Sequence, residues 1–169
     1  MMFSAHLDVV REFDPADILV EKANIVSRKK GILGADDRAG VAIILNLLKE
    51  VGNIKDIPPF KFVFTVGEEQ SQYGAEAIDP DFFEDVSFGI SLDRRNCNDI
   101  VYRSSSQEYS SLEFAEGVAR ISSRIFSMEN KFVPCEGGIS DLRVWSEKDT
   151  RPCVNLSVGY SHEHKDNEC

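Results

Sequence analysis

Apolar and polar residues along this chain form blocks that are typical of strands alternating with helices. Short apolar blocks between turn residues predict strands at residues 1–5, 23–27, 60–66, 86–92, 100–103 and 152–158, with a short extended piece at 131–134. Longer blocks with apolar residues three or four positions apart predict helices at 37–51, 73–78, 107–126 and 141–147. This alternation predicts one α/β domain over residues 1–169, with a mostly parallel central sheet and helices on both faces.

The two longest predicted helices each carry an apolar stripe that should face the core. In the helix at 37–51 the stripe consists of Val41, Ile44, Leu45 and Leu48. In the helix at 107–126 it consists of Phe114, Val118, Ile121 and Ile125. The strand at 60–66 is apolar on both faces, which predicts a central strand covered by helices. The polar segment 9–22, which contains Asp14-Pro15, predicts a loop.

Composition and charge limit the classes of partner that this domain is expected to bind. The chain has 169 residues, 42% of them hydrophobic and 28% charged, which is enough for one soluble domain with a sizeable core. The net charge of −10 disfavours nucleic acid as a partner, because a phosphate backbone would be repelled. No apolar run approaches the ~18 residues of a membrane span, and the first residues show no secretory signal. We therefore expect neither a nucleic acid nor a membrane as partner.

The cysteines bear on the compartment. They are widely spaced, with no C-x-x-C pair: Cys97, Cys135, Cys153 and Cys169. This spacing argues against a structural zinc site and, without a secretory signal, favours reduced thiols in a cytoplasmic protein.

Polar residues with ligand chemistry follow several of the predicted buried strands. The sequence places His6-Leu7-Asp8, Glu68-Glu69 and Asp93 at three strand ends, and His162 and His164 after the last strand. A further pair, Asp36-Asp37, lies in a glycine-flanked turn before the first long helix. Sites in α/β sheets form outside the carboxyl ends of the strands, so these groups could converge on one crevice.

Each of these pairs has a simpler interpretation when it is taken alone. Two aspartates before a helix are typical of an N-cap and of the first helical turn. One histidine beside one aspartate is typical of a surface pair. Five acids gathered in one crevice, however, would repel one another unless cations lay among them. Imidazole and carboxylate ligands suit Zn²⁺ or a similar divalent ion, and two ions ~3.5–4 Å apart can share one carboxylate.

Five motifs, in this order, resemble those of the co-catalytic dizinc exopeptidases. This clan includes single-domain zinc aminopeptidases, peptidase T-like tripeptidases and acetylornithine deacetylase-like hydrolases. The motifs span almost the whole chain: His6-Leu7-Asp8, Gly34-Ala35-Asp36-Asp37-Arg38-Ala39-Gly40, Gly67-Glu68-Glu69, Ser91-Leu92-Asp93 and His164-x-x-x-Glu168. Each motif alone is weak, and the five together make the resemblance specific.

The resemblance implies a role for each motif residue. Asp36 would bridge two divalent ions, Zn²⁺ first, with Co²⁺ or Mn²⁺ as alternatives. His6 and Asp93 would complete the protein ligands of one ion, and Glu69 and His164 those of the other. Glu68 would be the general base and then the general acid towards an amide, with a water activated between the ions. Asp8 would hold His6 in the required tautomer, and the bond between Asp36 and Asp37 is expected to be cis.

Several assignments stay open at this stage. His162 competes with His164 as a ligand, and the glutamate four residues after the histidine favours His164. The substrate-binding candidates are Tyr160, His162, Gly138 and Ser140. For Tyr160 the alternative is core packing, and for the turn at 137–141 it is a simple helix start. Arg94 and Arg95 could meet a substrate carboxylate or lie in an exposed turn.

The layout resembles the lidless members of the clan. Only one strand and one helix are predicted between Asp93 and Gly137, where relatives insert a lid or dimerisation domain. Both ends are shorter than in those relatives, so we expect either a homo-oligomer or a trimmed chain. The function predicted first is an aminopeptidase that removes N-terminal residues from peptides. The alternatives are an N-acyl amino acid amidohydrolase and a non-catalytic metal-binding or interaction domain derived from the same fold.

Overall fold

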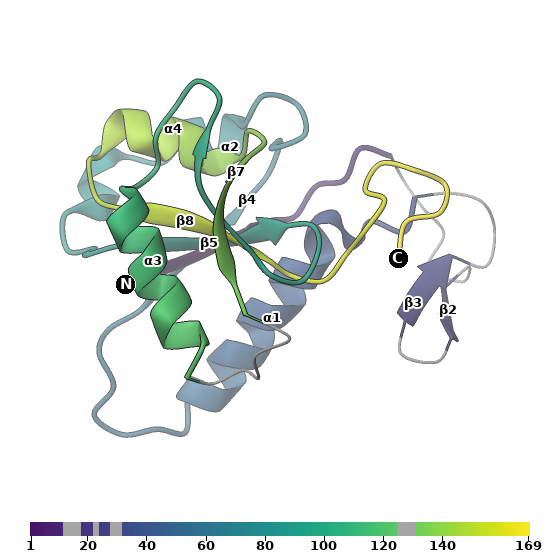
Figure 1. Cartoon of the computed structure of the whole chain (residues 1–169), viewed down its shortest axis with the longest axis horizontal. Coiled ribbons are helices and arrows are strands. Elements are labelled where there is room, and N and C mark those ends of the chain that lie inside the picture. The colour runs from purple at the N-terminus through teal and green to yellow at the C-terminus, as the bar shows by residue number, and fades with distance from the viewer. Residues whose placement is uncertain (12–17, 22–23, 28–31, 125–130) are drawn as a thin grey trace.

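The computed structural model describes residues 1–11, 18–21, 24–27, 32–124 and 131–169, and Figure 1 shows their arrangement. The strands are β1 (Met2–His6), β2 (Ile18–Glu21), β3 (Asn24–Ser27), β4 (Lys61–Thr65), β5 (Gly89–Arg94), β6 (Asp99–Ser104), β7 (Val133–Gly137) and β8 (Cys153–Ser157). The helices are α1 (Ala35–Val51), α2 (Tyr73–Glu76), α3 (Leu112–Ser122) and α4 (Asp141–Lys148), with a short 3₁₀ helix at Pro80–Phe83.

Six of these strands form the central sheet, in the order β4-β1-β5-β8-β6-β7. The strands β4, β1, β5 and β8 are parallel to one another. The pair β6 and β8 is antiparallel, whereas β7 runs parallel to β6. The predicted mostly parallel sheet is therefore confirmed. The carboxyl ends of the four parallel strands meet at one edge, which is where a site is expected.

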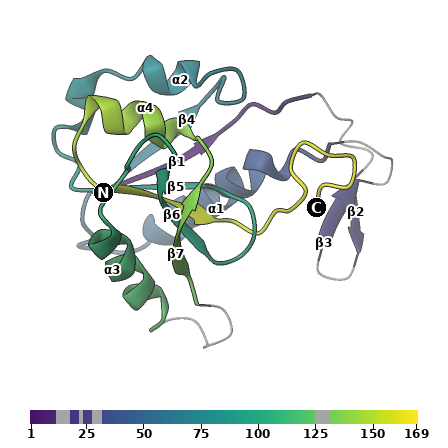
Figure 2. The same cartoon turned by 45° about the horizontal axis from the view of Figure 1, so that its top comes forward.

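Helices cover both faces of this sheet, as the sequence predicts. Met2 on β1 belongs to a core with Leu142 and Trp145 of α4. The next strand position, Phe3, points to the opposite face and packs in a second core with Ile44 of α1. In Figure 2, α2 and α4 lie on one side of the sheet, and α1 and α3 lie on the other. Alternation along β1 thus feeds two cores, one on each face.

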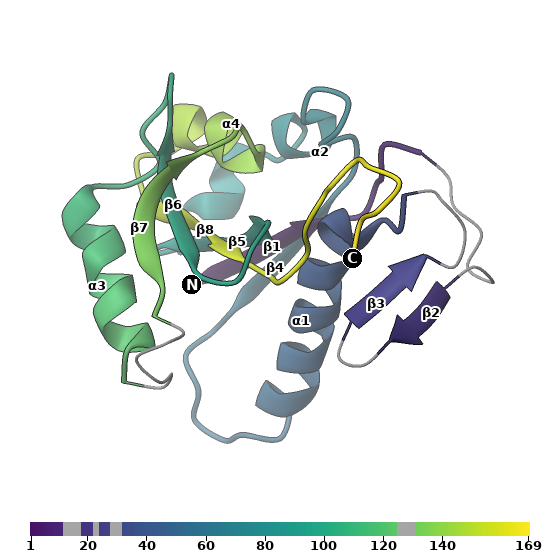
Figure 3. The same ribbon diagram turned by 45° about the vertical axis from the view of Figure 1, so that its right-hand side comes forward.

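The strands β2 and β3 form a separate antiparallel ribbon beside α1 and the C-terminus, as Figure 3 shows. The predicted loop at 9–22 is wrong where β2 occupies Ile18–Glu21, and its residues 12–17 and 22 lie outside the described part of the chain. The ribbon is largely exposed, with Val20 at 68%. The apolar run Ile18-Leu19-Val20 is only three residues long and shows no alternation, so it did not distinguish a strand from the surrounding polar loop.

The predicted central position of the strand at 60–66 is also wrong, because β4 is the outermost strand on one side of the sheet. Its apolar residues nevertheless face both cores. Val63 packs on the side of α4, while Phe62 stacks on Phe3 on the side of α1. An apolar pattern on both faces therefore reports coverage by helices and not lateral position in the sheet.

The two long helices differ from their predicted stripes at one position each. In α1, Ile44 is fully buried but Leu45 is 55% exposed. In α3, Ile121 is 61% exposed, and Ile125 lies outside the described residues. The helix α3 begins later than predicted, because Ser111 acts as its N-cap and accepts a hydrogen bond from the Phe114 amide at 3.2 Å.

The cysteines and the helix lengths bear on two further expectations. All four cysteines are free thiols, with Cys97 exposed and Cys153 buried. Within the described residues, the helices are too short or too polar to cross a membrane.

Candidate metal centre

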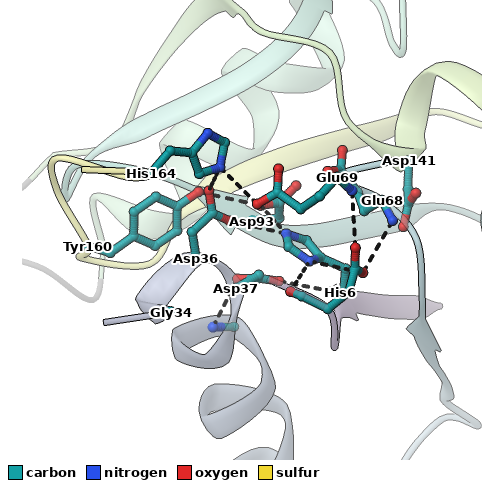
Figure 4. A network of polar contacts seen from close by, with 12 residues as sticks. His6, Gly34, Asp36, Asp37, Glu68, Glu69, Asp93, Asp141, Tyr160 and His164 are labelled. Carbon is teal, nitrogen blue, oxygen red and sulfur yellow. Dashed lines mark hydrogen bonds and ion pairs between the residues drawn. The ribbon is translucent and has the colours of Figure 1, made fainter. Parts of the chain in front are cut away.

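Polar side chains from four strand ends converge at one edge of the sheet, as Figure 4 shows. His6 ends β1, and Asp93 lies near the end of β5. Glu68 and Glu69 follow β4, and His164 comes from the segment after β8. The sequence interpretation placed these groups in one crevice, and the structure brings them together.

Asp36 lies at the centre of this group. Its Oδ1 is 3.1 Å from Nε2 of His6, and its Oδ2 is 3.1 Å from Nε2 of His164. The same His6 nitrogen is 3.5 Å from Oδ1 of Asp93, and the His164 nitrogen is 2.8 Å from Oε1 of Glu69. The two oxygens of one carboxylate therefore face two separate pairs, each made of one histidine and one acid.

The loop that carries Asp36 is held in an uncommon main-chain conformation. The peptide bond between Asp36 and Asp37 is cis, as predicted. Gly34, just before it, has φ of +71°, and a Cβ there would lie 2.0 Å from Nη1 of Arg38. Asp36 and Asp37 have non-helical φ and ψ although α1 includes both. The alternative in which an aspartate caps this helix is observed for Asp37, whose Oδ1 accepts a hydrogen bond from the Gly40 amide three residues later, and not for Asp36.

Asp37 is fully buried and binds main-chain N–H groups. Its Oδ2 accepts from the His6 amide at 3.1 Å, and its Oδ1 accepts from the Gly40 amide at 3.2 Å. By distance alone, His6, Asp37 and Asp93 could hold an ion, as could His6, Asp36 and Glu69. Because both oxygens of Asp37 already have hydrogen-bond donors, Asp36 and not Asp37 is the better candidate for a ligand beside His6.

Asp8 also binds main-chain N–H groups. Its Oδ1 and Oδ2 each lie 3.2 Å from an amide, that of Glu68 and that of Glu69 respectively. Nδ1 of His6 lies 3.0 Å from the Asp8 carbonyl oxygen and 3.5 Å from its Oδ1. Asp8 is thus placed behind His6, where the resemblance puts it, and it additionally fixes the turn that presents both glutamates.

The acids in this group alter one another's protonation. Burial and the nearby Asp93 raise the pKa of Glu68 to about 8. Burial and then Asp36 raise the pKa of Glu69, and burial raises the pKa of Asp93. Burial lowers the pKa of His6, but hydrogen bonds to Asp36 and Asp93 outweigh it and raise that pKa to about 12. Such mutual repulsion between acids is what a divalent cation relieves, so the donor set fits metal ions.

A cavity of about 370 Å³ opens over this group. Its lining includes Asp36, Glu68, Glu69, Asp93 and His164. Among the substrate candidates, Tyr160 and Gly138 line the same cavity. The hydroxyl of Tyr160 donates to Oδ1 of Asp93 at 3.4 Å.

The other two substrate candidates lie away from this cavity. Ser140 is buried at the start of α4 and makes no capping hydrogen bond with its side chain. His162 is exposed and contacts its neighbour Ser161, with 3.1 Å between Nδ1 and Oγ. Of the two histidines that competed for the ligand position, the structure therefore places His164 in the group.

The sequence interpretation missed three features of the site. Arg95 pairs with Glu163 at the cavity wall, with 2.6 Å between Nη1 and Oε1. Asp141 is buried beside the group and accepts a hydrogen bond from Thr65, and burial raises its pKa to about 6. Glu168 was noted only for its spacing from His164. The sequence held a signal for Asp141, which lies in the turn motif at 137–141. It held none for Arg95 and Glu163, because ordinary exposed loops also carry such residues.

Ser71, in the turn after Glu69, has φ of +95°. An L side chain is strained there, at a cost of about 1–3 kcal/mol, and glycine is not. Relief of this strain stabilises the folded state, and the greater entropy of glycine in the unfolded chain offsets part of the gain. We therefore expect Ser71→Gly to raise the free energy of unfolding by about 1 kcal/mol. Urea denaturation measures this. The matched control is Ser87→Gly, at an exposed position outside the positive-φ group, which should be destabilised; equal losses in both variants would contradict the expectation.

Comparisons with known proteins agree with this fold. The model of peptidase family M28 matches residues 1–168. The uncharacterized protein YqjE of Bacillus subtilis (strain 168) is 34% identical over 93 residues, which cover 54% of this chain and 24% of YqjE. The chain therefore spans only a minor part of that relative's length.

Among solved structures, a tripeptidase from Staphylococcus aureus matches with a TM-score of 0.75 and 19% identity, over 99% of this chain and 74% of that one. Aminopeptidase PepT from Bacillus cereus matches with a TM-score of 0.69 and 21% identity, over the same shares. The dodecameric PhTET1-12s matches with a TM-score of 0.68 and 20% identity, over 89% of this chain and 47% of that one. These likenesses show a shared fold. Because the family model spans all but the last residue of the sequence, the chain belongs to peptidase family M28.

Proposed function

We propose that this chain is the catalytic domain of a metallopeptidase that holds two divalent ions, with zinc as the first candidate. Asp36 would bridge the ions. His6 and Asp93 would hold one of them, and Glu69 and His164 the other. The observation that carries this proposal is that the two oxygens of Asp36 face two different pairs of one histidine and one acid.

Bound there, the two ions would supply Lewis acidity and lower the pKa of a water molecule. Glu68 lines the cavity and makes none of the four contacts that join Asp36 to its two pairs. We assign it the proton transfers: it takes a proton from the attacking water and returns it to the leaving amine. Asp8 supports this division, because it binds the amides of both glutamates and so fixes the direction in which each side chain leaves the turn.

The proposed reaction is removal of N-terminal residues from peptides. The similar structures include proteins described as an aminopeptidase and a tripeptidase, which supports a peptide substrate. Hydrolysis of aminoacyl amides or p-nitroanilides is expected. Hydrolysis of N-acyl amino acids instead would favour the amidohydrolase alternative.

The experiment that tests the metal centre is ion stoichiometry per chain, measured by elemental analysis after dialysis at neutral pH. Wild type is expected to bind two divalent ions, and Asp36→Ala one or none, because that change removes the shared ligand. The matched control is Asp166→Ala, which changes an exposed aspartate two residues after His164 and should keep both ions. Wild type that binds no ion even with added zinc would contradict the metallopeptidase proposal and favour a non-catalytic domain.

A further inference from the structure

The loop after β8 is closed at its base and contacts the Asp36 segment from one side. The Ser161 amide donates to the Cys169 carbonyl at 2.8 Å, and the Cys169 amide donates back to the Ser161 carbonyl at 3.1 Å. Two side chains of this closed loop, His164 and Glu168, reach the same segment. His164 lies against the Asp36 carboxylate, as described above, whereas Glu168 lies against the main chain.

Glu168 is only 1% exposed, and both of its oxygens accept main-chain hydrogen bonds. Its Oε2 accepts from the Gly34 amide at 2.8 Å, and its Oε1 accepts from the Asp36 amide at 3.0 Å. A buried carboxylate is costly unless such bonds compensate it, and charge-assisted bonds are the stronger kind. The guanidinium of Arg38 supplies nearby positive charge. Glu168 does not line the cavity, so its contacts act on the segment that carries Asp36.

We propose that Glu168 is a positioning residue that fixes the main chain on both sides of Ala35, so that the two oxygens of Asp36 face His6 and His164. The inference rests on the proposed function, because the direction of those oxygens matters for activity only if Asp36 bridges two ions. Asp8 offers a parallel within the same site, since it binds the amides of Glu68 and Glu69. Two ligand-bearing turns would thus each be held by one carboxylate that binds two main-chain N–H groups.

The test is Glu168→Gln. The amide has the shape of the carboxylate but only one acceptor oxygen, so its NH₂ must face one of the two main-chain donors. We expect the weaker of the two ions to bind 10–100-fold less tightly, as is typical when the partner of a ligand is changed. Zinc titration against a chromophoric chelator measures this, with circular dichroism to show that the variant is folded. Glu168→Asp, which keeps the charge, should recover part of the affinity. Asp166→Asn, at an exposed position in the same loop, should bind both ions like wild type.

The outcomes separate this inference from the proposed function. If wild type binds two ions and folded Glu168→Gln binds both with unchanged affinity, Glu168 has no positioning role and the proposed function stands. If wild type binds fewer than two, the proposed function and the inference fail together. If Glu168→Gln does not fold, amide hydrogen exchange on wild type decides. The Gly34 and Asp36 amides should then exchange about 100-fold more slowly than that of Asp166, and equal rates would overturn the inference.

Discussion

Glu68→Gln is expected to lower kcat for an aminoacyl p-nitroanilide by about 10²–10⁴-fold, the usual contribution of a general base. The glutamine keeps the shape and the main-chain contacts of Glu68 but cannot take a proton from water. Glu69, next to it, contacts His164, so the two glutamates have different surroundings although they are adjacent in sequence. The variant should therefore keep both bound ions. Steady-state kinetics and ion stoichiometry, measured on the same preparation, check both parts of this expectation.

Glu76→Gln is the matched control for this prediction. Glu76 is an exposed glutamate in α2, and its main-chain carbonyl accepts a hydrogen bond from Lys148. Its kcat should equal that of wild type. Full activity in Glu68→Gln would move the proton transfer to another residue. Loss of an ion in that variant would instead make Glu68 a ligand, and the assignment of Glu68 and Glu69 would have to be exchanged.

The positions around Asp36 could be predicted from the sequence because each follows a recognisable local pattern. His6 and Asp93 lie at the ends of short apolar blocks, and the parallel topology that brings such ends together follows from the alternation of strands and helices. The choice between His162 and His164 could not be made from strand ends, because both follow β8 closely. The structure separates them, since His162 points to Ser161 and His164 to Asp36.

The contacts of Asp8 with the glutamate turn, of Asp37 and of Glu168 could not be predicted. Each of these carboxylates binds at least one main-chain N–H group of a distant segment, and every residue except proline has such a group. Glu168, for example, binds the Gly34 amide 134 residues earlier in the chain. Main-chain partners leave no residue type, spacing or periodicity in the sequence that would identify them. A short-range pattern therefore finds the side chains that face the site and misses those that hold its loops.

The position of a strand within the sheet, and the exposure of residues at the margin of a helix face, also could not be predicted from the sequence. β4 has apolar residues on both faces because α1 and α4 cover it from opposite sides. Its residue types do not indicate which strand lies beside it, so its place in the sheet could not be predicted. Leu45 continues the periodic stripe of α1 but lies at its margin, whereas Ile44 at the centre is fully buried. Periodicity gives the direction of a helix face and leaves the width of its contact to the packing.

Gly40→Ala should have the largest effect on stability. A Cβ at Gly40 would lie 1.8 Å from the carbonyl oxygen of Leu92 in β5 and 2.5 Å from Oδ1 of Asp37. The first of these neighbours is main chain, so α1 must move away from the sheet or β5 must bend. We expect the free energy of unfolding to fall by more than about 3 kcal/mol, beyond the usual cost of an overpacked core. Because Gly40 also donates to Asp37, whose other oxygen binds the His6 amide, ion binding should weaken too.

Gly117→Ala separates this effect from helix propensity. Gly117 also lies inside a helix, α3, but among the described residues a Cβ there meets only Nη2 of Arg120, at the ordinary distance of 3.6 Å. Alanine should therefore stabilise the protein by about 0.5–1 kcal/mol. The same glycine-to-alanine substitution should therefore change the free energy of unfolding in opposite directions at the two positions. Urea unfolding of both variants measures these changes. A gain in stability for Gly40→Ala would mean that α1 and β5 do not approach each other this closely, and Asp36 would then lie too far from β1 and β5 to share an ion with His6 and Asp93.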